Sequence, residues 1–187
     1  GYGCEHMPYG IRAAGALIEY LSETQKNALQ HINRIQTYHL DRHMILDFHT
    51  RRNLELVETM RSKQKKGSLL WLLDKTNTAM GGRLLKKWIQ QPLTNPKKIN
   101  KRLDAIEELT QNFFLMDELK DHLNLVYDLE RLASKVCYGS VNARDLISLK
   151  ESVKVLPDIK ELLSKCTSDL LREIYEDLDP LEDIYSL

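Results

Sequence analysis

Apolar residues recur at intervals of three and four along most of this 187-residue chain, and this spacing predicts amphipathic helices. The pattern covers residues 11–35, 99–109, 113–126, 146–156 and 159–178. Between residues 36 and 47 the apolar positions alternate loosely instead, which indicates an extended piece. We therefore predict an all-α fold, a multi-helix bundle-like domain with at most a short extended segment near residues 37–47.

Polar residues with helix-capping side chains stand in front of most of the apolar runs. The predicted caps are Ser68, Thr78, Asn95, Asp128 and Asn142. Asp47 or Thr50 is expected to cap a further helix that carries Leu54, Val57 and Met60. The sequence Pro8-Tyr9-Gly10 predicts a turn before the first helix.

The stretch 67–93 holds both tryptophans and two short apolar runs, which the turn-forming residues 74–78 separate. Gly81 and Gly82 lie near the start of the second predicted helix, where each weakens the helix by about 1 kcal/mol. Their presence indicates that another backbone approaches there. The apolar spacing places these residues in the predicted core: Leu70, Leu73, Leu84, Leu85, Trp88, Leu103 and Ile106. Trp71 is also expected to be buried.

This stretch resembles the start of the helical core, or lever, domain of the MutS family of DNA mismatch-repair proteins. The family pattern is matched by Leu69, Leu70, Leu73, Asp74, Thr76, Thr78, Met80, Gly81, Arg83, Leu84, Leu85, Trp88, Pro92 and Leu93. Two further blocks, residues 44–56 and 128–146, resemble the same family. Ala79 and Ala143 stand where relatives often have proline, a departure that a helix accepts.

The resemblance implies that residues 1–32 are the tail of a connector-type domain and that residues 33–187 begin an incomplete lever domain. It further implies a structural coupling segment, which links the ATPase part of a larger parent protein to the parts that hold mismatched DNA. Met80, Gly81, Gly82 and Arg83 are the candidate coupling contact. For the parent, it implies ATP and Mg²⁺ as cofactors, double-stranded DNA with mismatches as partner, and a cytoplasmic homodimer.

No catalytic, cofactor-binding or metal-binding residues are predicted in the chain itself, so we expect no enzyme activity from it alone. The sequence lacks the phosphate loop Gly-x-x-x-x-Gly-Lys-Ser/Thr, and it lacks the Phe-x-Glu wedge with which the family binds mispairs. His39 and His43 are four residues apart, but a segment predicted to be extended does not bring such a pair together on a metal.

Lys plus Arg and Asp plus Glu both number 27, so the net charge is zero, which argues against a dedicated nucleic-acid-binding module. A local basic run consists of Arg61, Lys63, Lys65 and Lys66. It is predicted to be a solvated linker or, at most, a weak and salt-sensitive contact to a DNA backbone. Three scattered cysteines indicate reduced thiols, and no apolar run is long enough to cross a membrane.

Two alternatives to the coupling segment remain at this stage. The chain could be a free-standing helical protein-interaction module, or the equivalent segment of a MutS relative that acts in recombination. The sequence on either side of the chain would distinguish them, because the coupling role requires a phosphate loop elsewhere in the same protein.

Overall fold

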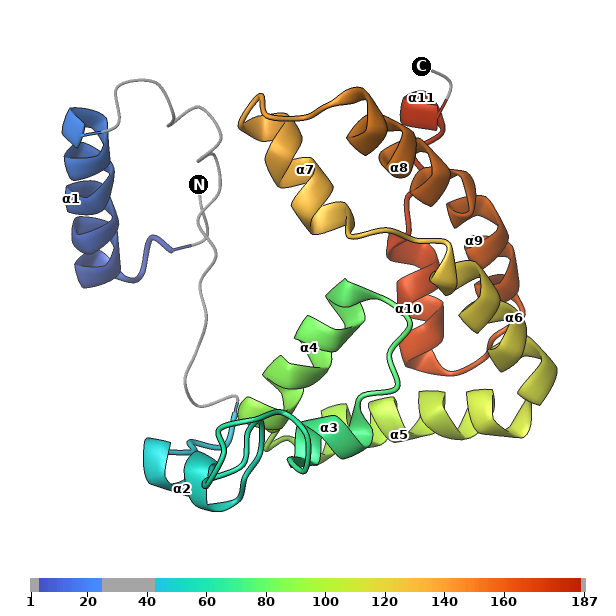
Figure 1. The fold of residues 1–187 in the computed structure, drawn as a ribbon, viewed down its shortest axis with the longest axis horizontal. Coiled ribbons are helices and arrows are strands. Elements are labelled where there is room, and N and C mark those ends of the chain that lie inside the picture. Colours follow the sequence, from blue (N-terminus) through green and yellow to red (C-terminus); the bar gives the residue numbers. More distant parts are fainter. Residues whose placement is uncertain (1–3, 25–42, 186–187) are drawn as a thin grey trace.

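The computed structural model describes residues 4–24 and 43–185, and within these ranges the chain is helical without a β-sheet (Figure 1). The prediction of an all-α fold is confirmed. The helices are α1 (Pro8–Thr24), α2 (Phe48–Asn53), α3 (Leu69–Leu73), α4 (Ala79–Gln90), α5 (Pro96–Gln111), α6 (Phe113–Asn124), α7 (Leu129–Cys137), α8 (Ala143–Lys154), α9 (Leu156–Ser164), α10 (Asp169–Asp177) and α11 (Glu182–Tyr185).

The predicted extended segment falls partly on residues 37–42, which lie outside the described residues. Residues 43–47 are not helical, and His43 forms an isolated antiparallel bridge with Leu93. The Met44 amide donates to the Pro92 carbonyl at 2.8 Å. This contact ties the chain before α2 to the connection between α4 and α5.

The predicted helix caps are confirmed, because each side chain accepts a hydrogen bond from an amide in the first turn of its helix. The acceptors are Ser68 for α3, Thr78 for α4, Asn95 for α5, Asp128 for α7 and Asn142 for α8. Asp47 caps α2 in the same way, through the Thr50 amide at 2.6 Å. Capping depends only on neighbouring residues, which is why the sequence reveals it.

Two local predictions are wrong. Pro8 does not begin a turn but the helix α1, where proline is favoured because the first-turn amide has no helical partner. The helix expected to carry Leu54, Val57 and Met60 ends at Asn53. Beyond it, the backbone carbonyls of Glu55 and Leu56 accept hydrogen bonds from the amides of residues 69 and 70, and this pairing replaces a helix.

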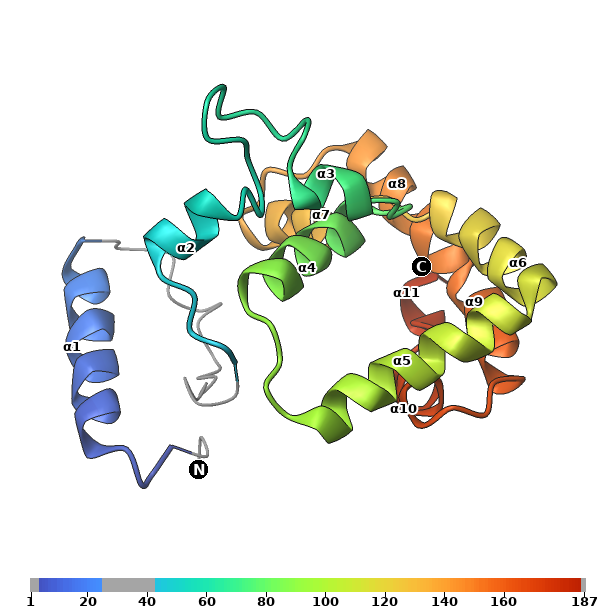
Figure 2. The same ribbon diagram turned by 90° about the horizontal axis from the view of Figure 1, so that it is seen from below.

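The hydrophobic core lies among α5, α6, α8, α9 and α10, which pack together in the half of the molecule that contains the C-terminus (Figures 1 and 2). Helix α9 contributes most to it, with four buried residues. The cluster consists of Ala105, Leu115, Leu119, Val153, Val155, Leu156, Ile159, Leu162, Leu163, Cys166 and Leu171. These helices therefore form one packed body, which we call the bundle.

The predicted core is mostly wrong. Only Leu70 is buried, Leu85 is half-buried, and the other predicted residues are exposed: Leu73, Leu84, Trp88, Leu103 and Ile106. Trp71 is exposed as well, at 47%. Helical spacing identifies an apolar face but not the element that covers it. Helix α5 shows this, because it turns Ala105 and Leu109 toward the bundle core instead of the predicted residues.

Glu108 of α5 binds the chain just before α10, about 60 residues away in the sequence. Its carboxylate accepts hydrogen bonds from the amides of Ser168 at 2.8 Å and Thr167 at 2.6 Å, and from the Thr167 hydroxyl at 3.0 Å. These bonds from Ser168 and Thr167 lower the pKa of Glu108 to about 2. The carboxylate thus fixes the two residues that lead into α10, whose N-cap Ser168 makes no side-chain capping bond.

We predict that these hydrogen bonds to Glu108 make stability sensitive to acid. The folded pKa lies below the ordinary value of 4.5, so the stabilisation is complete above that pH and is lost as pH falls toward about 2. Replacing Glu108 by Gln should cost about 1–2 kcal/mol at neutral pH. It should also reduce the loss of unfolding free energy between pH 4.5 and 2, which urea unfolding measures. The neighbouring Glu107→Gln should retain this loss, and equal pH profiles for both variants would contradict the prediction.

Candidate functional site

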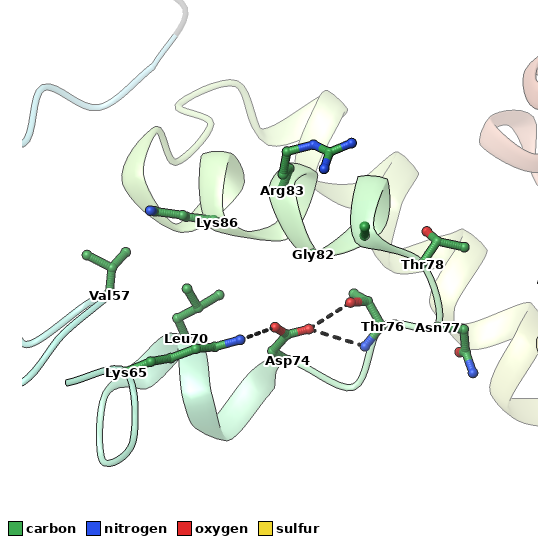
Figure 3. Close-up of a pocket in the computed structure, with 11 residues that line it drawn as sticks. Val57, Lys65, Leu70, Asp74, Thr76, Asn77, Thr78, Gly82, Arg83 and Lys86 are labelled. Atoms are coloured by element: carbon green, nitrogen blue, oxygen red, sulfur yellow. Dashed lines mark hydrogen bonds and ion pairs between the residues drawn. The ribbon is translucent and has the colours of Figure 1, made fainter. Parts of the chain in front are cut away.

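The turn between α3 and α4 is organised around the Asp74 carboxylate (Figure 3). It accepts hydrogen bonds from the Thr76 hydroxyl at 2.7 Å and the Thr76 amide at 3.3 Å, and it forms an ion pair with Lys65. Lys65 and then Thr76 lower the pKa of Asp74 to about 2. At neutral pH Asp74 is therefore ionised, and its bonds to Thr76 and Lys65 stabilise the turn.

The glycine pair of α4 faces this turn. A Cβ atom at Gly81 would lie 3.0 Å from the Thr78 hydroxyl oxygen, which caps the helix by accepting from the Gly81 amide. A Cβ atom at Gly82 would lie 3.3 Å from the Thr76 hydroxyl oxygen. The close neighbour of the glycines is thus the turn of their own chain. A coupling contact of residues 80–83 with another part of a larger protein stays a prediction.

Arg83, one turn into α4, reaches two acidic side chains at the start of α7. Its guanidinium donates to both carboxylate oxygens of Asp128, at 2.7 and 2.9 Å, and twice to Glu130, at 2.6 and 2.9 Å. Asp128 and then Glu130 raise the pKa of Arg83, and the guanidinium lowers the pKa of Asp128. We call these three residues the Arg83 junction.

The Arg83 junction connects segments that are far apart in the sequence. Asp128 also caps α7, because its carboxylate accepts a hydrogen bond from the Arg131 amide at 3.2 Å. The carboxylate that binds Arg83 is therefore the same one that stabilises the start of α7. A second contact lies nearby, where the Asn77 amide group donates to the Asn124 side-chain oxygen at 2.9 Å. The turn and the first half of α4 are therefore joined to the connection between α6 and α7.

An open pocket of about 680 Å³ lies between the loop before α3 and the start of α4 (Figure 3). Its lining includes Lys65, Asp74, Thr78, Arg83 and Lys86. Lys65 and Arg83 are engaged by acidic partners, which leaves Lys86 as the lining cation outside these ion pairs. Within residues 4–24 and 43–185, no group of three or more His, Cys, Asp or Glu side chains is placed to hold a metal ion.

The basic run lies in the loop between α2 and α3, and all four of its side chains are exposed. Lys65 points to Asp74 and Lys63 adopts a left-handed backbone conformation, with φ 51°. The cations are thus not aligned on one helix face. Their contact with a DNA backbone stays a prediction.

Sequence reasoning identified Arg83 but missed its partners. Asp128 was predicted only as a helix cap, and Glu130 was not singled out. The acidic pair at a helix start is visible in the sequence, but it attracts cations in general and does not specify which one. The sequence places Asp74 in a turn, but its ion pair with Lys65 is identified only by the structure.

Comparisons with known proteins place the chain in a family. The model of MutS domain III matches residues 49–185. The chain is 54% identical over its full length to the DNA mismatch repair protein MutS of Alkaliphilus oremlandii and 53% identical to that of Halothermothrix orenii, and it covers 21% of each. It is 50% identical to the MutS of Lachnoclostridium phytofermentans, of which it covers 20%.

The chain thus spans about a fifth of the length of these curated relatives. The part of the chain that the structure describes contains no helix long and apolar enough to cross a membrane. The matched residues include the turn, α4, the Arg83 junction and the whole bundle. The chain therefore belongs to the MutS family of DNA mismatch-repair proteins, and residues 49–185 correspond to its domain III.

Proposed function

We propose that this chain is a structural coupling segment of a DNA mismatch-repair ATPase, linking the ATPase part to the parts that hold mismatched DNA. The observation that carries the proposal is the Arg83 junction. It fixes α4 to the start of α7, and the bundle core lies beyond it. A close-packed core transmits a displacement rather than absorbing it, so a force on α4 would reach the bundle through this contact.

The remaining properties of the parent protein belong to the same proposal. They are ATP and Mg²⁺ as cofactors, double-stranded DNA with mismatches as the partner, a homodimeric state and a cytoplasmic location. Within the chain, residues 1–32 would be the tail of a connector-type domain, and residues 33–187 the first part of the lever domain. The nucleotide would be bound elsewhere in the parent, because the chain has no phosphate loop.

The length of the relatives supports a coupling segment over a free-standing interaction module, since the chain corresponds to only 21% of the first of them. The sequence also lacks the Phe-x-Glu wedge. Binding of mismatched DNA and hydrolysis of ATP would therefore take place in other parts of the parent. The chain's contribution is mechanical, and it depends on charged contacts that hold helices in register.

The test uses the full-length parent protein with Arg83 replaced by Met, which keeps the length of the side chain and removes its charge. We expect the ATP-induced change in mismatch affinity to shrink by about 1–3 kcal/mol, the usual size of a coupling free energy. Lys86→Met is the matched control, because Lys86 is an exposed cation on the same helix. The proposal fails if the Arg83→Met protein binds mismatched DNA with the same ATP response as the control.

A further inference from the structure

The described residues that precede α5, in the ranges 4–24 and 43–95, are not part of the bundle core. Helix α4 has no buried residue, and no residue of α2, α3 or α4 belongs to the core cluster. Residues 43–90 have a small buried group of their own, formed by Leu56, Ser68 and Leu70. The backbone bonds of residues 69 and 70 to residues 55 and 56 hold this part together. We call residues 43–90 the α3–α4 unit.

Three contacts of polar or charged side chains connect the α3–α4 unit to the bundle side. They are the Arg83 junction, the bond between Asn77 and Asn124, and the stacking of Arg102 on Trp88, with the guanidinium carbon 3.6 Å from the ring centre. The Arg83 side chain is 50% exposed, that of Glu130 67% and that of Asp128 23%. Because the guanidinium and Glu130 are in contact with solvent, dissolved salt screens their attraction.

The covalent connection between the two parts is a short non-helical segment. Helix α4 ends at Gln90 and α5 begins at Pro96 after its cap Asn95, so residues 91–95 lie between two helices. Residues 43 and 44 are bonded to residues 92 and 93 of this segment. A rotation at its end next to α5 therefore moves the α3–α4 unit as one body and breaks no bond of the bundle core.

We propose that the Arg83 junction is an ionic latch, and that its release lets the α3–α4 unit swing away from α7 while both parts stay folded. The latch consists of one cation against two carboxylates, so it closes at low ionic strength and opens as salt screens the charges. It is a property of this chain's own fold and does not depend on the proposed coupling role. Loss of the Arg83 charge should favour the open form roughly tenfold, which corresponds to about 1.4 kcal/mol.

The chain carries suitable probes for this motion. Its two tryptophans, Trp71 and Trp88, both lie in the α3–α4 unit. Cys137, at the end of α7, is exposed and free, whereas Cys4 and Cys166 are buried. An acceptor fluorophore on Cys137 therefore reports the separation of α4 from α7 through energy transfer from tryptophan, and far-ultraviolet circular dichroism reports whether the helices remain.

The experiment measures transfer efficiency in the labelled 187-residue chain between about 0.01 and 1 M NaCl, over which the screening length falls from about 30 to about 3 Å. In the unmodified chain, we expect efficiency to fall with salt at constant helix content. Arg83→Met should show the low value at every salt concentration, and Lys86→Met should behave as the unmodified chain. Asp128→Asn combined with Glu130→Gln removes the opposite charges and should match Arg83→Met, while Asn still caps α7.

Two outcomes would overturn the latch. One is a transfer efficiency in the unmodified chain that does not change with salt while the helices persist. The other is an Arg83→Met chain, or the Asp128→Asn, Glu130→Gln chain if Arg83→Met loses helix content, that keeps the low-salt efficiency of the unmodified protein. Either result would mean that contacts other than the charges hold the two parts together.

Discussion

Replacing Leu163 by Ala is expected to lower the free energy of unfolding by about 2–5 kcal/mol. Leu163 is 5% exposed and lies in the bundle core, where a shortened side chain leaves a cavity that the surrounding helices fill only in part. The measurement is urea unfolding followed by circular dichroism. Leu72→Ala is the control, because Leu72 is 62% exposed and its truncation creates no cavity. Equal losses for the two variants would place the core elsewhere.

Replacing Ser152 by Val is expected to cost on the order of 2–5 kcal/mol, from an unsatisfied buried amide and from overpacking. Ser152 is 0% exposed, and its hydroxyl oxygen accepts from the Tyr127 amide at 2.9 Å while the hydroxyl donates to the Ser148 carbonyl at 2.8 Å. This bond ties α8 to the segment between α6 and α7. The valine removes it and adds a methyl group where there is no room.

The matched control for this change is Ser134→Val. Ser134 is an exposed helical serine whose hydroxyl bonds to the Glu130 carbonyl at 2.8 Å, in the same pattern four residues back. Its replacement should change the unfolding free energy by less than about 1 kcal/mol. Ser152→Ala separates the two contributions, because it removes the hydrogen bond without adding volume. A Ser152→Val protein as stable as the control would show that the hydroxyl is not part of the core.

The helix starts could be predicted from the sequence, and the core could not. Ser68, Thr78, Asn95, Asp128 and Asn142 cap their helices as predicted, because a cap and its amide are at most three residues apart. Trp88 was predicted in the core from its helical spacing. It is 37% exposed, and Arg102 lies on its ring. Replacing Trp88 by Ala should therefore lower the free energy of unfolding by less than Leu163→Ala does.

The candidate site could likewise be predicted only in part from the sequence. The glycines near the start of α4 correctly indicated a close neighbour, but the expected backbone is not what lies there: the nearest atoms are side chains of the adjacent turn, those of Asp74, Thr76 and Thr78. The partner of Arg83 lies 45 residues away, and nothing in the local sequence selects Asp128 over the other carboxylates. The role of Glu108 could not be predicted either, because its hydrogen bonds to Thr167 and Ser168 depend on how α5 and α10 pack. Contacts between residues so far apart in the sequence can be identified only from the folded structure.

The central claim is that Arg83 and Asp128 act together in linking ATP to mismatch binding, and a double-mutant cycle in the full-length parent tests it most directly. The cycle compares Arg83→Met, Asp128→Asn and the double variant, with the ATP-induced change in mismatch affinity as the measured quantity. Asn at 128 retains the helix cap, so the cycle isolates the ion pair. We predict that the double variant loses no more of the ATP response than Arg83→Met alone. Strictly additive losses, or an undiminished ATP response in all three variants, would contradict the account.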